Sequence, residues 1–259
     1  VEHLTIPAST ETIDGLAFAN CVGLRTLEFE EGSQLKEISS GAFSNCPQMT
    51  LKNPEVLTKL RTIGDHAFED CTSLTAFPLP ESLTNIGPAA FRGCFSLSGQ
   101  IVFPASLKNL SAEVFANCIS LESAKFIPRE KYVMKPGFFA GCEKLSKVTG
   151  LNNAVEIGAC AFMGCTSLRE LKLGAGLTSI GDWAFKGCLS LSTDVPASAA
   201  KIGEDAFAYT ESVTYAGQTE ETAPGALESD SQKIGSHPYF PVSGRTVRKE
   251  HQLKLTAFD

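Results

Sequence analysis

The chain holds nine cysteines and four histidines, the residue types that most often act as nucleophiles, metal ligands or redox pairs. No two cysteines have the Cys-x-x-Cys spacing of zinc and dithiol sites, and His3, His66, His237 and His251 form no ligand cluster. We find no Gly-rich phosphate loop, no His-Glu-x-x-His motif, no Gly-x-Ser-x-Gly motif and no paired carboxylates. The sequence therefore predicts no enzyme activity, no cofactor and no metal site.

Eight of the nine cysteines recur at a regular interval, each three residues after a phenylalanine. The phenylalanine column is Phe18, Phe43, Phe68, Phe91, Phe115, Phe139, Phe162, Phe185 and Phe207. The cysteine column is Cys21, Cys46, Cys71, Cys94, Cys118, Cys142, Cys165 and Cys188, with Thr210 in the ninth copy. Successive phenylalanines lie 22 to 25 residues apart, a period typical of leucine-rich repeat solenoids. Both columns are predicted to form the core.

The cysteine column is predicted to hold buried free thiols. Repeats stack at about the 4.8 Å spacing of neighbouring strands, which is short enough for a disulfide. Equivalent residues in a stack point the same way, however, whereas a disulfide needs converging Cβ atoms. Cys160 lies outside the column, at the position of His66 and Trp183. It is the candidate for an exposed, reactive thiol, with half-burial as the alternative.

One phrase recurs in nine copies, and its clearest form is I-G-D-W-A-F-K-G-C-L-S-L from Ile180 to Leu191. Its Ala, Phe, Cys and Leu fall at i, i+1, i+4 and i+7, which predicts one face of a short helical turn. Two residues after each phenylalanine stands Gly, Asn or Asp in eight copies, which predicts a left-handed residue that ends the turn. An extended segment follows, such as Leu168–Leu173 or Leu74–Leu79, then a turn rich in proline and a second short strand.

These elements predict a right-handed, curved α/β-type solenoid of nine coils over residues 1–216, with parallel strands and short helical turns. Residues 217–232 are polar and lack apolar periodicity, which indicates a linker or loop. Residues 233–259 carry a net charge of +3 and several apolar residues, so they are interpreted as a C-terminal cap or a basic partner-binding tail.

The chain resembles the BspA-like, or Treponema-type, leucine-rich repeat family. The resemblance rests on the sequence L-P-E-S-L-T-N-I-G-P-A-A-F-R-G-C-F-S-L from Leu79 to Leu97 and covers roughly residues 4 to 215. It implies a surface-exposed or secreted protein that adheres to host proteins or to other cells. The alternative is an intracellular, cytoplasmic protein-interaction scaffold, since the reduced cysteines fit a reducing compartment better.

A protein partner is expected on the concave face of the longer strands, because a wide helical edge would curve the array toward them. The outward residues there are Thr26, Glu28, Gln100, Val102, Ser123, Lys125, Lys147, Thr149, Glu170 and Lys172. These residues are small or polar, with a lysine in three successive coils, which indicates a broad, mixed-charge protein surface instead of a deep small-molecule pocket. Changing the three lysines to glutamate is expected to slow association with an acidic partner. The alternatives are a solvated face with no partner, or recognition by the irregular segment Glu130–Pro136.

Nucleic acid is excluded as the partner by a net charge of −7 and a pI near 5.2. No apolar run reaches the length of a membrane span, so membrane insertion is not expected. The oligomeric state is left open by the sequence.

Overall fold

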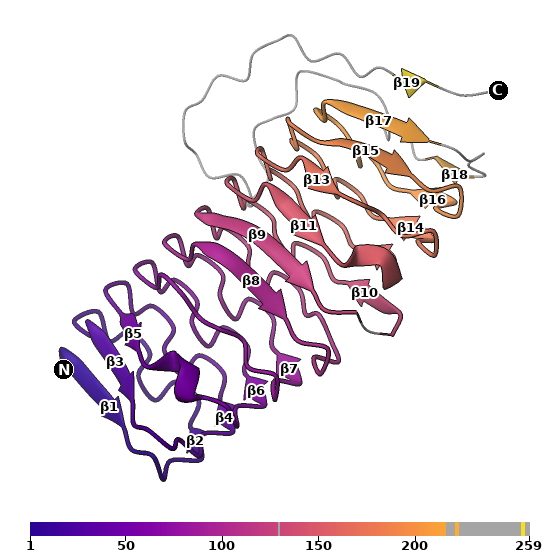
Figure 1. The fold of residues 1–259 in the computed structure, drawn as a ribbon. Coiled ribbons are helices and arrows are strands. Elements are labelled where there is room, and N and C mark those ends of the chain that lie inside the picture. The colour runs from indigo at the N-terminus through magenta and orange to yellow at the C-terminus, as the bar shows by residue number, and fades with distance from the viewer. Residues whose placement is uncertain (129, 216–220, 223–254, 257–259) are drawn as a thin grey trace.

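The computed structural model describes residues 1–128, 130–215, 221–222 and 255–256. The coils stack along one axis from the N-terminus to the C-terminal end, as Figure 1 shows. The coils together build a row of longer strands and a row of shorter strands, and every strand pair of the described residues is parallel. The predicted leucine-rich repeat solenoid is confirmed.

The longer strands form three sheets that follow one another along the array (Figure 1), in the orders β1-β3-β5, β8-β9-β11-β13 and β15-β17-β19. Their bounds are β1 (His3–Ile6), β3 (Thr26–Phe29), β5 (Thr50–Lys52), β8 (Gly99–Phe103), β9 (Leu121–Phe126), β11 (Lys147–Thr149), β13 (Glu170–Leu171), β15 (Ser192–Val195), β17 (Ser212–Tyr215) and β19 (Leu255–Thr256). The expected strand over Leu74–Leu79 does not form, because Pro78 has no N–H to donate to a sheet. Its absence separates β5 from β8.

The shorter strands form two sheets, in the orders β2-β4-β6-β7 and β10-β12-β14-β16-β18. Their bounds are β2 (Thr12–Ile13), β4 (Glu37–Ile38), β6 (Thr62–Ile63), β7 (Asn85–Ile86), β10 (Tyr132–Met134), β12 (Ala154–Ile157), β14 (Ser179–Ile180), β16 (Lys201–Ile202) and β18 (Glu221–Thr222). Two 3-10 turns, η1 (Pro54–Val56) and η2 (Leu151–Asn153), are the helical elements among the described residues.

Two of the strands lie beyond the predicted boundary of the solenoid at residue 216. β18 falls within the predicted linker and pairs with β16, while β19 falls within the predicted cap or tail and pairs with β17. The other residues of 217–259 lie outside the described part of the chain.

The recurring phrase forms consecutive turns instead of the expected helical turn. The residue two positions after the phenylalanine is left-handed in all nine coils, as predicted for eight of them, and Tyr209 adopts it as well with φ 62°. A second left-handed residue, two positions before the phenylalanine, was not predicted. It is Leu16, Gly41, His66, Ala89, Glu113, Gly137, Cys160, Trp183 or Asp205. Two such residues within five positions break the α-helical conformation.

The turns are held to one another by backbone hydrogen bonds. The N–H groups of Trp183, Phe185 and Gly187 donate to carbonyl oxygens of the next coil at 2.8, 2.7 and 2.8 Å, and equivalent bonds recur along the array. This edge is therefore spaced by hydrogen bonds, as the strands are. A helix of about 10 Å diameter, from which the curvature was expected, is not present among the described residues.

The phenylalanine column forms a continuous stack of rings inside the coils. Centroids of successive rings lie 5.1 to 6.0 Å apart, with interplanar angles between 2° and 26°. The rings from Phe43 to Phe207 have no exposed surface, and Phe18 in the first coil is half-buried. The stacked rings thus form a continuous apolar contact from coil to coil along the axis.

All nine cysteines are free thiols, and seven of the eight in the column are buried. The Sγ atom of each one from Cys46 to Cys188 donates to the carbonyl oxygen of the phenylalanine in the preceding coil, at 3.1 to 3.2 Å. Cys160 is only 6% exposed, so the expectation of an exposed thiol there is wrong. Burial raises the pKa of Cys160 to about 11, and the half-buried Cys21 is the more accessible thiol.

The glycine of the Ile-Gly pair is required by the close approach of neighbouring coils. A Cβ atom on Gly181 would lie 2.5 Å from the nitrogen and 2.8 Å from the Cα of Ala159. Because both are backbone atoms, Gly181→Ala is expected to lower the free energy of unfolding by about 1–3 kcal/mol, as other overpacking substitutions do. Gly176→Ala is the control, since nothing lies within 4 Å of its Cβ position. Urea titration of both variants checks this, and equal stability of the two would contradict the packing described.

Candidate partner-binding face

The outward side chains of the longer strands form one surface, which we call the strand face. Its side chains fall into two columns along the array, because residues of one column are paired in register from strand to strand. Gln100, Ser123, Lys147 and Glu170 form one column, and Val102, Lys125 and Thr149 form the other. Nearer the N-terminus, Thr26 lies between His3 and Thr50, and Glu28 lies between Thr5 and Lys52.

Most of the residues predicted to bind a partner are accessible. Gln100, Val102, Lys125, Lys147, Thr149, Glu170 and Lys172 are exposed, whereas Thr26, Glu28 and Ser123 are half-buried. The intervening side chains, such as Val148 and Ala124, point into the core. Because outward and inward side chains alternate, about every second residue of a strand contributes a small, polar or charged group to this surface.

The three lysines of the predicted row do not lie in one column. Lys147 pairs with Glu170 of the next strand at 2.5 Å, so its charge is neutralised on the surface. Lys125 lies in the other column, and Lys172 follows β13 by one residue on that side. Within the described part of the chain, neither Lys125 nor Lys172 has a carboxylate partner. The three lysines therefore lie on successive coils, as expected, but in two columns of the face.

Sequence reasoning missed Lys52, which lies on the strand face beside Glu28 with their charged atoms 3.4 Å apart. The segment after Cys46 is irregular in sequence, so a short strand and a longer loop are expected within Pro47–Pro54, and the strand forms as β5, but its register with β3 was not predicted. The alternation of Thr50, Leu51 and Lys52 was the available signal.

The irregular segment Glu130–Pro136, the second candidate for recognition, is partly structural. Tyr132 and Met134 are buried in β10, the Tyr132 ring stacks on Phe126 with centroids 5.9 Å apart, and its Oη donates to the carbonyl of Gly150. Glu130 and Lys131 are the exposed residues at its start. The departure from the repeat pattern is explained by this packing.

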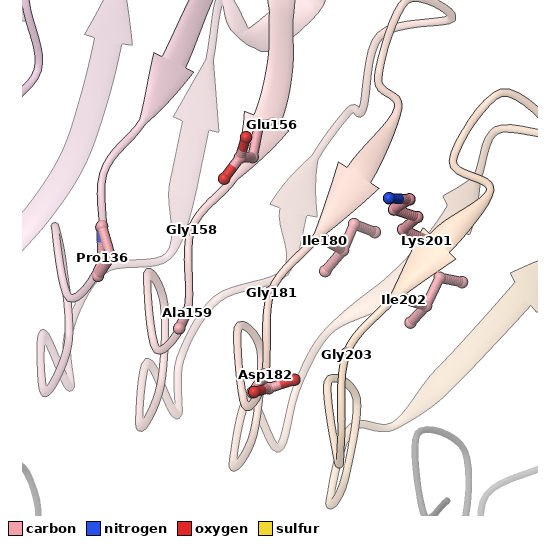
Figure 2. Close-up of a pocket in the computed structure, with 10 residues that line it drawn as sticks. All are labelled: Pro136, Glu156, Gly158, Ala159, Ile180, Gly181, Asp182, Lys201, Ile202 and Gly203. Atoms are coloured by element: carbon pink, nitrogen blue, oxygen red, sulfur yellow. The ribbon is translucent and has the colours of Figure 1, made fainter. Parts of the chain in front are cut away.

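A pocket of about 620 Å³ lies on the other side of the solenoid, along the shorter strands (Figure 2). Its lining residues are Pro136, Glu156, Gly158, Ala159, Ile180, Gly181, Asp182, Lys201, Ile202 and Gly203. Figure 2 shows its charged side chains, Glu156, Asp182 and Lys201, spread along three coils instead of converging on one point. No nucleophile with an adjacent base lines it, so it offers no catalytic arrangement.

Among the described residues, no group of three or more His, Cys, Asp and Glu side chains could hold a metal ion. None of the helices in the same part of the chain has the length and apolar character needed to cross a membrane.

Several solved structures resemble this fold. A leucine rich repeat protein of T. pallidum is 27% identical over 64% of this chain and 78% of its own, with a TM-score of 0.56. A leucine-rich repeat protein from Eubacterium ventriosum is 22% identical over 81% of this chain and 59% of its own, with a TM-score of 0.59. A leucine rich cell surface protein from Faecalibacterium prausnitzii is 21% identical over 84% and 80% of the two chains, with a TM-score of 0.44.

A comparison with curated proteins gives no significant match. The pattern of the BspA type leucine rich repeat region, by contrast, matches six copies over residues 1–130 and 131–229. This match covers most of the sequence and agrees with the coils, the phenylalanine stack and the cysteine ladder. The chain belongs to the BspA-type leucine-rich repeat family.

Proposed function

We propose that this chain is a non-enzymatic adhesion or recognition module, secreted or at the cell surface, that binds a protein partner through the strand face. The observation that carries the proposal is the strand face itself, a long and accessible surface of polar and charged side chains. Extended surfaces of this kind suit protein partners, whereas small molecules need enclosed pockets. Membership of a leucine-rich repeat family supports a protein-interaction repeat module.

An intracellular scaffold is the second proposal, and the nine free thiols favour it. Structural disulfides mark exported proteins, and reduced cysteines are usual in the cytosol. The same strand face would then serve an intracellular partner. An export signal or a surface anchor in the full-length gene would decide for the first proposal.

Large side chains placed on the strand face test the binding surface. The double variant Ser123→Trp/Thr149→Trp covers the centre of the face. Its matched control, Thr62→Trp/Ser179→Trp, places the same side chains on two of the shorter strands, where both residues are half-buried as Ser123 is. Binding is measured by surface plasmon resonance against a panel of purified extracellular-matrix and serum proteins.

The proposal predicts a partner in this panel whose affinity falls about tenfold or more with the strand-face variant and stays unchanged with the control, as expected for a disrupted interface centre. Equal affinity of both variants, or loss only with the control, would place the interface elsewhere. Absence of any binding from the panel would count against the adhesion function itself. Circular dichroism confirms that both variants keep the fold.

A further inference from the structure

Lys125 and Lys172 lie on the strand face on either side of one residue, Thr149, which belongs to the strand between them. The register pairs Lys125 with Thr149, and continuing the pairing of Val148 with Leu171 by one residue places Thr149 beside Lys172. Two strand spacings separate the lysines, so their Cα atoms lie about 10 Å apart. Flexible four-carbon stems allow both ammonium groups to reach one group bound above Thr149. All three side chains are exposed.

The other lysines of this face are already paired. Lys147 contacts Glu170 at 2.5 Å, and Lys52 contacts Glu28 at 3.4 Å. Each of these pairs joins adjacent strands in register. Because Thr149 occupies the corresponding place between Lys125 and Lys172, no carboxylate of the described chain neutralises them. The face therefore carries two lysines that form no ion pair with the described residues, in a protein whose net charge is −7.

We propose that the partner is an acidic polypeptide segment, one carboxylate of which binds above Thr149 between Lys125 and Lys172. This inference rests on the proposed function and adds the chemistry of the partner. The carboxylate accepts charge-assisted hydrogen bonds from the two ammonium groups, and the Thr149 hydroxyl donates a third. The partner's carboxylate is the anionic partner of these two lysines, as Glu170 is the anionic partner of Lys147.

The surroundings favour a short acidic segment over a polyanion. The next longer strand, β15, carries the exposed Asp194, which forms no ion pair with Lys172 among the described residues. Together with the net charge of −7, this carboxylate repels dense arrays of negative charge such as nucleic acid. A single carboxylate flanked by neutral residues avoids that repulsion.

Short peptides test the site directly. The probes are a terminally blocked decapeptide with a central glutamate among Gly, Ser and Val, and its glutamine and lysine analogues. They are titrated into the full-length protein labelled with ¹⁵N, and backbone amide shifts are recorded. The glutamate peptide is expected to shift the amides at Lys125, Thr149 and Lys172. The analogues should leave these amides unmoved, and added salt should weaken the shifts.

Three variants separate this site from a general charge effect. Lys125→Gln/Lys172→Gln is expected to weaken glutamate-peptide binding about tenfold, in line with the loss of electrostatic attraction. Lys108→Gln/Lys144→Gln removes the same charge from two other exposed lysines and should leave binding unchanged. Lys147→Gln/Glu170→Gln removes the paired charges and should also leave it unchanged.

Shifts centred on other lysines, or equal weakening by the Lys108/Lys144 variant, would overturn the proposal, as would the absence of any shift. These outcomes are distinguishable from failure of the proposed function. If the tryptophan variants lose a protein partner but Lys125→Gln/Lys172→Gln keeps it, the strand face binds and the carboxylate site is wrong.

Discussion

Phe115→Ala is expected to lower the free energy of unfolding by about 3–5 kcal/mol, the usual range for a truncated buried aromatic side chain. Phe115 has no exposed surface, and its ring contacts the rings of Phe91 and Phe139 at 5.2 and 6.0 Å. Phe103 packs edge-on against it at 5.6 Å. The substitution therefore opens a cavity in the middle of the stack and weakens the contact between three coils. Urea unfolding followed by circular dichroism measures the loss.

Phe18→Ala is the matched control. Phe18 is half-buried in the first coil and stacks on one ring only among the described residues, that of Phe43 at 5.3 Å. Truncation there removes less buried surface, so we expect a clearly smaller loss than at Phe115. An equal loss at both positions, or an unchanged stability of Phe115→Ala, is incompatible with a continuous ring stack as the centre of the fold.

Alkaline pH is expected to destabilise the protein steeply, because burial raises the pKa of the thiols in the column. The pKa of Cys46 rises from 9.0 to about 11, and that of Cys118 rises well above its ordinary value. In the unfolded chain these thiols ionise near pH 9. The folded state therefore binds more protons above that pH, and its stability, complete below pH 9, falls as the pH rises. At pH 10 each buried thiol lowers the free energy of unfolding by about 1.4 kcal/mol relative to neutral pH.

Cys118→Ser isolates the contribution of one thiol. Serine retains a donor for the carbonyl of Phe91, which Cys118 contacts at 3.2 Å, but it does not ionise in this range. We expect the variant to lose about 1.4 kcal/mol less than the parent protein between pH 8 and pH 10. Lysines and tyrosines titrate equally in both proteins and cancel in the difference. Identical pH dependence of the two proteins would show that the thiol is accessible to water.

The solenoid could be predicted from sequence because its cause is periodic. Phe and Cys recur every 22 to 25 residues, because a position that is buried in every coil keeps the same type of residue at a regular interval. The left-handed residue two positions before each phenylalanine has no such signature in the sequence. Its side chains, such as Leu16, His66, Glu113 and Trp183, share no chemical property. Their backbone conformation is imposed by hydrogen bonds to the next coil instead of by the side chain. Helix and turn were therefore not distinguished by the apolar pattern.

The outward side chains of the strand face could be predicted from the sequence, but the ion pairs between them could not. Alternation of apolar and polar residues identified the outward side chains, but an ion pair depends on which residue lies opposite on the next strand. Lys147 and Glu170 are 23 residues apart and meet only in the observed register. The same limit applies to Cys160, whose burial depends on the neighbouring coils and not on its own position in the phrase.

A photo-crosslinking comparison tests the central claim, binding through the strand face, most directly. The crosslinking residue p-benzoylphenylalanine replaces Val102 on β8, which is 36% exposed, or Val133 on β10 of the shorter strands, which is half-buried. Each protein is irradiated with a partner identified in the binding panel, and crosslinked products are located by mass spectrometry. The account predicts a crosslink from position 102 and none from position 133. A crosslink from position 133 alone would contradict it.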